Sequence, residues 1–188
     1  MGDFRHETTR LVLRDWREAD WGPFFEGTNT PAVMRWLGGV LDEPKRADVR
    51  RRLEDYAVRN GHTFWAVERR KDGAILGFCG LKRCNEPGGP VGEMEAGWRL
   101  REDAWGKGYA KEAASASLGL AFTRFGVDRV IALTVRRNTA SWGLMERLGM
   151  ERRAELDFDL QRGDAFFDPE DPTVIVYAIT RETWESQS

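Results

Sequence analysis

The sequence predicts an α/β (or α+β) fold in which helices flank a mixed β-sheet. Three observations carry this prediction. A hairpin pattern surrounds Lys71-Asp72-Gly73 in the first half of the chain. The second half alternates strand-like and helical segments in the order strand, helix, strand, helix, strand. No Pro-, Gly- or Ser-rich linker interrupts the 188 residues, so we expect residues 1–188 to form a single domain.

The N-terminal third predicts one strand and three helices. Their expected bounds are 10–14 for the strand and 19–26, 32–37 and 46–60 for the helices. Trp21, Phe24 and Phe25 recur at near-helical spacing in the first of these helices. Gly61 follows the last helix and is suited to be its C-cap.

A β-hairpin and a further strand come next. Segments 64–68 and 75–81 flank Asp72-Gly73, a pair that favours a tight primed turn. Residues 85–92 hold two prolines and three glycines, which predicts a loop. The strand after it is expected over 93–100.

The clearest helical pattern of the chain covers residues 108–125. Its apolar stripe consists of Ala110, Ala114, Leu118, Ala121, Phe122 and Phe125. A strand is expected over 129–135, and Asn138 is suited to cap the helix that follows and ends at Gly149. Two more strands are expected, over 152–158 and 173–179.

Composition limits the function classes. Lys and Arg number 29 and Asp and Glu 31, and this net charge of −2 argues against binding to nucleic acid through phosphate contacts. No stretch approaches the ~20 apolar residues of a membrane span, and the first residues resemble no secretory signal. We therefore expect a cytoplasmic protein without a membrane partner. Two cysteines, Cys79 and Cys84, and two histidines predict neither a disulfide framework nor a metal site.

The segment Trp105-Gly106-Lys107-Gly108-Tyr109-Ala110 joins a predicted strand to the 108–125 helix. Glycines let the backbone turn its N–H groups inward, and a helix start adds unsatisfied donors and a positive dipole end. Together they predict an anion site, typically for a diphosphate, with Lys107 and Lys111 at its rim. Lys111 occupies the third glycine place of G-x-G-x-x-G, so the dinucleotide fingerprint is absent. On this feature alone, an ordinary structural turn is an equal alternative.

Three segments together resemble the GNAT N-acetyltransferases, and most of all their RimJ/RimL-type branch. The segments are 105–110, Glu95-Ala96-Gly97-Trp98 before it, and the downstream run from Asn138-Thr139-Ala140-Ser141 to Leu148-Gly149-Met150. Trp105 stands in the first place of the pattern Q/R-x-x-G-x-G/A, as is typical of that branch. The resemblance covers about residues 8 to 180. It implies a twisted, mostly antiparallel sheet that splits at its centre, between the strands ending at Leu100 and near Val135.

The resemblance also implies acetyl-CoA as the co-substrate. Pantetheine would pair with the backbone of one split strand, the pyrophosphate would rest on the amides after it, and the helix that begins near 138 would face the sulfur. The implied cofactor-binding residues are Trp98, Arg99, Leu100, Trp105, Gly106, Lys107, Gly108, Tyr109, Ala110, Asn138 and Ser141.

The implied reaction is direct acetyl transfer to a primary amine, on a protein N-terminus or a small molecule. A base must remove a proton from the amine, and Glu95, at the Glu place of the branch's Glu-x-Gly-Tyr motif, is the first candidate. Glu93 lies on the same side of the strand and is the second; solvated strand carboxylates are the alternative for both. Met145 stands where many GNAT enzymes carry a Tyr that protonates the thiolate. Ser141 is therefore the expected donor to sulfur, unless it only begins a helix.

Other functions stay open. A catalytically silent acyl-CoA-binding or sensing module on the same fold gains weight from Met145, and a mononucleotide-binding protein would use the same glycine loop. Trp16, Trp21 and Trp36 fall where the resemblance places the acceptor wall, and together they favour an apolar or cationic amine. Each alone is typical of a core aromatic. The resemblance also allows a homodimer, since dimers are common in the family.

Overall fold

The computed structural model describes residues 4–161 and 170–187. Within these residues nine strands form one sheet. The strands are β1 (Arg5–Glu7), β2 (Leu11–Arg14), β3 (Phe64–Arg69), β4 (Ile75–Arg83), β5 (Met94–Leu100), β6 (Arg129–Val135), β7 (Glu151–Arg152), β8 (Phe158–Asp159) and β9 (Thr173–Thr180). The α-helices are α1 (Trp21–Thr28), α2 (Pro31–Met34), α3 (Glu43–Asn60), α4 (Tyr109–Thr123), α5 (Thr139–Arg147) and α6 (Arg181–Ser186), and short 3₁₀ turns are η1 (Glu18–Asp20), η2 (Glu102–Ala104) and η3 (Ala154–Leu156).

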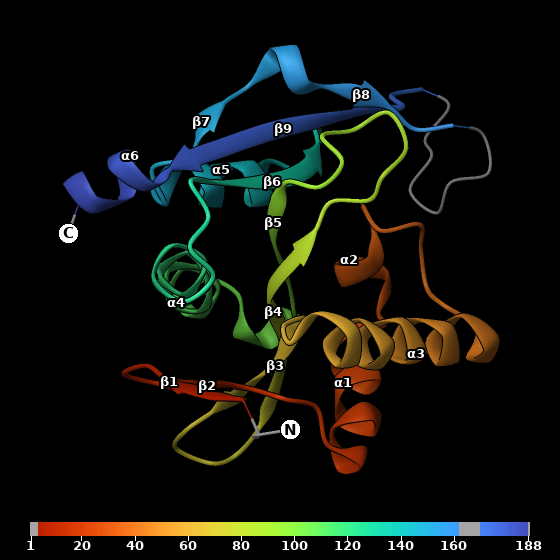
Figure 1. Cartoon of the computed structure of the whole chain (residues 1–188). Coiled ribbons are helices and arrows are strands. Elements are labelled where there is room, and N and C mark those ends of the chain that lie inside the picture. The colour runs from red at the N-terminus through yellow and green to blue at the C-terminus, as the bar shows by residue number, and fades with distance from the viewer. Residues whose placement is uncertain (1–3, 162–169, 188) are drawn as a thin grey trace.

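The sheet is split at its centre. Its strand order is β1-β2-β3-β4-β5-β6-β9-β7, with β8 paired to β9. All pairings are antiparallel except that of β5 with β6, which covers only Met94 opposite Val130 and Glu95 opposite Ile131. Beyond Glu95 the two strands diverge (Figure 1). The mixed, mostly antiparallel, centrally split sheet predicted from the sequence is confirmed.

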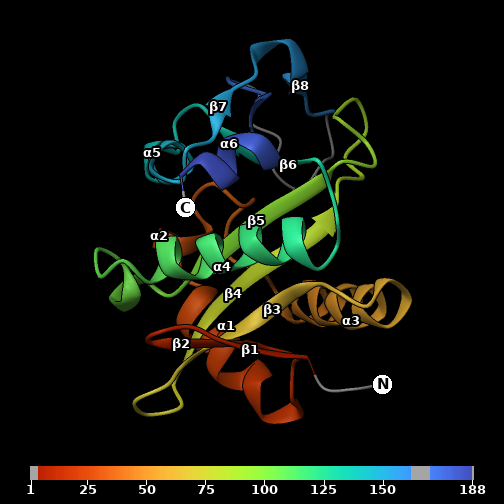
Figure 2. The same ribbon diagram turned by 60° about the vertical axis from the view of Figure 1, so that its left-hand side comes forward.

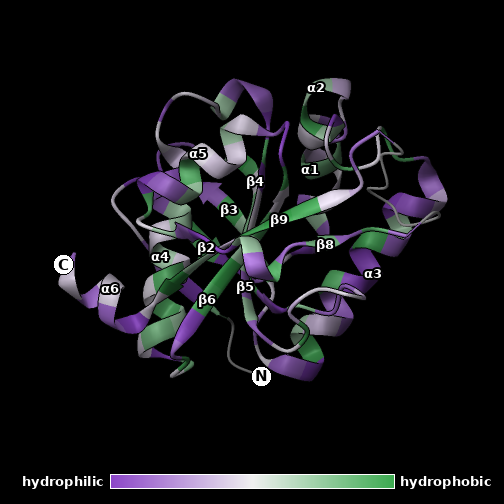
Figure 3. Cartoon of the chain, turned by 90° about the horizontal axis from the view of Figure 1, so that it is seen from above, coloured by the Kyte–Doolittle hydropathy of each residue, from purple (hydrophilic) through white to green (hydrophobic). Residues whose placement is uncertain are grey.

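Helices cover both faces of the sheet. In Figures 1 and 2, α4 lies on one face of β3, β4 and β5, and α1, α2 and α3 lie on the other. The predicted stripe of α4 is confirmed: Ala114, Leu118, Ala121 and Phe122 are fully or almost fully buried, in a core shared with the leucines of α5. In Figure 3, hydrophobic residues also colour β6 and β9 through the centre of the molecule. This burial of apolar area, at about 25 cal/mol per Å², holds the two halves of the split sheet to α4 and α5.

The predicted hairpin is confirmed, but its turn is longer than the primed turn that Asp72-Gly73 favours. Five residues, 70–74, connect β3 to β4, and the amide of Gly73 donates to the carbonyl of Arg69 (2.8 Å). Arg69 pairs with the carboxylate of Asp72 (2.7 Å), which also accepts from the amide of Ala74. Asp72 therefore organises the loop through its side chain, and Gly73 supplies its positive φ of 72°.

The predicted strand over 152–158 is wrong. The segment breaks into β7, the 3₁₀ turn η3 and β8. Asp157 ends the pairing, because its carboxylate accepts a hydrogen bond from the amide of Val176 and pairs with Arg152. Side-chain hydrogen bonds to the backbone thus replace the ladder. Pattern reasoning also missed β1 and α6, which are short and polar.

Several smaller expectations can be compared with the structure. Cys79 and Cys84 are free and buried, as expected for reduced core residues. Gly61 caps α3 with a φ of 70°. Among residues 4–161 and 170–187, no helix combines the length and apolar character that crossing a bilayer requires. In the same residues, no cluster of three or more His, Cys, Asp or Glu is placed to hold a metal ion.

Candidate functional site

Glu95 lies at the point where the sheet opens. It is the last residue of β5 paired with β6. Its neighbours Met94 and Ala96 point into the core beneath α4, so by strand alternation Glu95 points to the opposite face. Gly97, next on that face, lies under Phe64, whose ring would be 2.6 Å from a Cβ there. The base of the gap therefore carries one acidic side chain above an aromatic ring.

The Glu95 carboxylate is buried with one cation beside it. The residue is 8% exposed, and Lys82 Nζ lies 3.4 Å from Oε2. That contact is ionic, because within the described residues Oε2 accepts no hydrogen bond. Burial raises the pKa of Glu95 to about 7, against the opposing effect of Lys82. Near neutral pH this carboxylate can therefore accept a proton, which is the property that a general base requires.

The loop between β5 and α4 presents backbone amides. Gly106 and Gly108 have φ values of 68° and 78°, a region that side-chain-bearing residues rarely adopt. The first intrahelical bond of α4 runs from the Glu112 amide to the Gly108 carbonyl (3.1 Å). The amides of the three residues after Gly108 therefore have no partner inside the helix. With the positive end of the helix dipole behind them, these donors form a site for an anionic oxygen.

Thr8 and Arg10, just before β2, stabilise this loop, and we refer to these two residues as the Arg10 brace. Arg10 Nε donates to Glu112 (2.6 Å), its Nη1 donates to the Lys107 carbonyl (2.9 Å), and its guanidinium lies 4.6 Å from the ring centre of Tyr109. Thr8 Oγ1 donates to the same carboxylate (2.6 Å). Burial acts to raise the pKa of Glu112, but the hydrogen bonds outweigh it and hold the pKa below its ordinary value. Arg10 thus neutralises the acidic residue in the first turn of α4, which would otherwise repel an anion.

Trp105 ties the loop to the end of β5. Its indole N–H donates to the carbonyl of Leu100 (2.9 Å), and about half of the residue is exposed. Lys107 Nζ donates to the carbonyl of Asp103 (2.7 Å). The Leu100 carbonyl, expected to face pantetheine, therefore already carries one hydrogen bond. Both loop side chains support the backbone of the turn.

The start of α5 follows β6 on the other side of the gap. Asn138 precedes the helix as predicted, but its side chain makes no capping hydrogen bond. Ser141 is half-buried, and within the described residues its hydroxyl makes no hydrogen bond, so both polar groups are free to meet a ligand. Met145 is 1% exposed and belongs to the core.

Glu93 is separated from Glu95 by its partner. Its carboxylate binds the guanidinium of Arg129 through two contacts, of 2.6 and 3.3 Å. This ion pair joins the start of β5 to β6 and gives Glu93 a structural role. The structure therefore distinguishes the two carboxylates that the sequence placed on the same side: Glu95 is buried beside Lys82, and Glu93 is engaged with an arginine.

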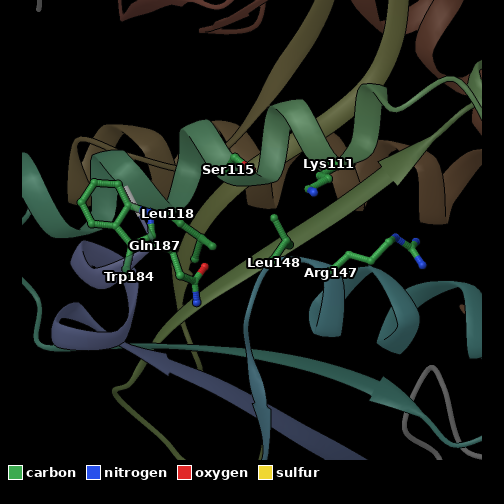
Figure 4. Close-up of a pocket in the computed structure, with 7 residues that line it drawn as sticks. All are labelled: Lys111, Ser115, Leu118, Arg147, Leu148, Trp184 and Gln187. Carbon is green, nitrogen blue, oxygen red and sulfur yellow. The ribbon is translucent and has the colours of Figure 1, made fainter.

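A pocket of about 220 Å³ lies between α4, α5 and α6. Lys111 on α4 and Arg147 on α5 stand at one end of it, and Trp184 and Gln187 from the C-terminal helix region stand at the other (Figure 4). Lys111 was expected at the rim of the anion loop, and Arg147 was not singled out from the sequence. Arg147 was missed because Lys111 and Arg147 are far apart in the sequence, and only the packing of α4 against α5 brings them to one pocket.

The side chains of the predicted strand site face two ways. Trp98 packs against the core beneath α4, whereas Arg99 is buried against Phe24 of α1 and Met34 of α2. Of the three tryptophans expected near an acceptor, Trp21 is 5% exposed and stacks on Trp16 at 4.1 Å, as core aromatics do. The ring centre of Trp36 lies 4.7 Å from the guanidinium of Arg35 and 5.4 Å from that of Arg137. Because side chains alternate along β5, the sequence alone could have placed Arg99 on the face opposite Trp98.

Comparisons with known proteins agree with this geometry. Residues 10–151 match the family described as "Acetyltransferase (GNAT) domain". The chain is 28% identical over 179 residues to the "Uncharacterized N-acetyltransferase YnaD" of Bacillus subtilis (strain 168), and the aligned part covers 94% of this chain and 97% of that protein. It resembles the crystal structure of the acetyltransferase from Agrobacterium tumefaciens str. C58, with a TM-score of 0.77, 24% identity and 96% of each chain covered. It also resembles the ribosomal-protein-S5-alanine acetyltransferase from Vibrio fischeri, with a TM-score of 0.70, 16% identity and 97% and 99% covered.

Proposed function

The chain belongs to the GNAT acetyltransferases, and on this basis we propose that it is an N-acetyltransferase of the RimJ/RimL-type branch, acting on a primary amine. Acetyl-CoA is the co-substrate of this family. One observation carries the proposal: a single gap in the sheet has free amides at its mouth and a buried carboxylate at its base. The branch assignment rests on Trp105 in the glycine loop and on the Asn138–Ser141 block.

In the proposed complex, the CoA pyrophosphate rests on the amides of residues 106–110. The backbone of Trp98 and Arg99 offers the open edge of β5 to pantetheine, and Asn138 stands on the far side of the gap. Lys111 and Arg147, which make no ion pair within the described residues, would bind a further phosphate of the nucleotide end. Backbone donors supply most of this recognition, and lysine or arginine adds charge.

In the proposed reaction the amine attacks the thioester directly. Glu95 takes the proton of the amine, itself or through water, as the new N–C bond forms and the C–S bond breaks. The electron pair leaves with sulfur, and the Ser141 hydroxyl donates a hydrogen bond to the thiolate, which solvent then protonates. An acyl-cysteine route is disfavoured for Cys79, because its burial raises the pKa of the thiol to about 12 and the side chain is fully buried.

The Arg10 brace supports this function by preorganising the loop. The brace neutralises Glu112 and holds the Lys107 carbonyl through a hydrogen bond from Arg10. A loop already ordered in the free protein loses less entropy when the cofactor binds. We propose that residues 1–188 act as one domain, because the brace joins the chain start to the helix at its centre.

A screen of acetyl-CoA turnover tests the proposal. Release of CoA would be followed over small amines, polyamines and peptides with free N-termini, each with a control in which the amine is already acetylated. The proposal expects release that depends on a free amine. CoA binding without release for any amine would instead support the silent acyl-CoA-binding module, and ATP binding without CoA binding would support a mononucleotide protein.

A further inference from the structure

Arg99 is a buried cation that contacts two aromatic rings. It is 7% exposed, and its guanidinium lies 4.6 and 5.2 Å from the ring centres of Phe24 and Phe78. Within the described residues no carboxylate approaches it, and burial alone lowers its pKa to about 10, so it remains charged at neutral pH. Cation–π contacts compensate a buried charge only in part. An anion that binds to this guanidinium would therefore stabilise it.

The free donors of Arg99 lie on one edge of the guanidinium. Nη1 contacts the sulfur of Met34 (3.4 Å), whereas Nε and Nη2 are buried and have no hydrogen-bond partner in the part of the chain that the structure describes. Nε–H and one N–H of Nη2 point the same way, in the fork that binds both oxygens of a carboxylate. Met34, from the short helix α2, contacts Nη1 and therefore does not occupy this fork.

A row of side-chain contacts connects Arg99 to Glu95. Phe78, beneath Arg99, stacks on Phe64 at 5.1 Å, and Lys82, the partner of Glu95, stands 5.9 Å from the ring centre of Phe64. Both phenylalanines are half-buried. Residues 95 and 99 are four apart on one strand, so their Cα atoms are separated by ~13 Å. This row thus has a proton acceptor at one end, two phenylalanine rings in the middle and, at the other end, a guanidinium that no carboxylate of the described residues pairs with.

We propose that Arg99 binds a carboxylate of the acceptor, so that the substrate is a primary amine whose carboxylate is separated from the amine by an apolar or aromatic body. This inference rests on the proposed function, because it takes the amine to Glu95. It differs from the apolar or cationic amine that Trp16, Trp21 and Trp36 favoured in the sequence. Arg99 is a specificity residue: it holds the acceptor and takes no part in proton transfer.

Matched acceptor pairs test the proposal. Dipeptides ending in Phe, and 6-aminohexanoate, would each be compared with their carboxamides on wild-type protein, Arg99→Met, Arg99→Lys and Arg101→Met. Arg101 is a matched control, since it lies two residues further along but pairs with Asp103 on the surface. We expect wild type and Arg101→Met to prefer the free acid by roughly 10- to 100-fold in kcat/KM, mainly through KM. Arg99→Met should erase the preference, and Arg99→Lys should keep part of it.

A second readout separates this role from a structural one. Because Arg99→Met removes an uncompensated buried charge, the free variant should melt at the same temperature as wild type or higher. A lower melting temperature with the acid preference retained would overturn the proposal. If Arg99→Met does not fold, Arg99→Lys decides: an undiminished preference overturns the proposal, and a reduced one supports it.

Binding measurements distinguish failure of this inference from failure of the proposed function. The same acid and amide pairs would be titrated calorimetrically into CoA-saturated wild type and Arg99→Met. If no amine is acetylated but the acid binds more tightly in an Arg99-dependent way, the acetyltransferase assignment fails and this inference stands. If amines are acetylated and acid and amide bind equally well, the inference fails and the assignment stands.

Discussion

Replacing Glu95 by Gln should stabilise the protein at alkaline pH while strongly reducing its activity. Gln keeps the shape of Glu95 but carries no charge in its buried position. Burial raises the pKa of Glu95 from 4.5 to about 7 in the folded protein, and at 1.36 kcal/mol per unit this shift corresponds to about 3 kcal/mol. Glu95 therefore destabilises the fold by up to that amount when it is ionised in both states.

The sign of the effect fixes its pH dependence. Below about pH 4.5 both the folded and the unfolded chain bind the proton, and Gln has no advantage. As pH rises towards 7 the unfolded chain releases the proton first, so wild type loses stability that the variant keeps. The advantage of Glu95→Gln should therefore grow between about pH 4.5 and 7 and stay constant above.

Urea unfolding at several pH values, from about 4 to 8.5, measures this difference. Glu93→Gln is the control, because Glu93 is partly exposed and paired with Arg129; it should show no gain at alkaline pH. In parallel, kcat/KM of Glu95→Gln should fall by roughly 10²–10⁴-fold and lose the acidic limb of the wild-type profile. A stability gain that is the same at every pH, or a loss at pH 8, would refute the reasoning about burial.

Three further predictions concern the cofactor and the leaving group. Acetyl-CoA at 100 times its Kd should stabilise the protein by roughly 2.7 kcal/mol, and a thermal-shift series in which ATP does this and CoA does not would contradict the site. Gly108→Asp should weaken CoA binding far more than Lys107→Ala, because it places a carboxylate and a strained φ at the amides, whereas Lys107 contacts the backbone; equal calorimetric losses would assign the anion to side-chain charge. Ser141→Ala should slow turnover by the contribution of one hydrogen bond, ~1 kcal/mol of transition-state stabilisation, and should keep the acidic limb of the pH profile. An unchanged rate would show that Ser141 does not donate to the leaving sulfur.

The strands and helices on either side of the gap, and the loop, were predictable because their signals are local, whereas the split of the sheet followed from the family resemblance. Period-2 and helical patterns identified β5, α4 and β6, and two glycines with positive φ marked the anion loop. The prediction for segment 152–158 failed because the carboxylate of Asp157 accepts a hydrogen bond from the backbone of Val176, 19 residues later, and no local pattern shows this contact. Short polar elements such as β1 bury too little apolar surface to leave a pattern.

The candidate site was predicted in part for the same reason. Glu95 was singled out by resemblance, but its burial beside Lys82 depends on the β4–β5 register. Arg10 and Glu112 meet across about a hundred residues, and Arg147 reaches the pocket only because α4 and α5 pack together. Arg99 was assigned to the cofactor through its backbone, and only the fold shows that its side chain is buried among aromatic rings with no carboxylate of the described residues beside it.

The most direct test of the account measures binding and product formation in the same two proteins. Wild type and Glu95→Gln would be titrated with CoA by calorimetry, and the acetylated amine would be quantified by mass spectrometry after incubation with acetyl-CoA and the amine panel. The account predicts equal CoA affinity in both proteins, with acetylated amine from wild type and at least a hundredfold less, at the low end of general-base effects, from the variant. Equal product from both would contradict the role of Glu95, and CoA binding without any acetylated amine from wild type would contradict the enzyme itself.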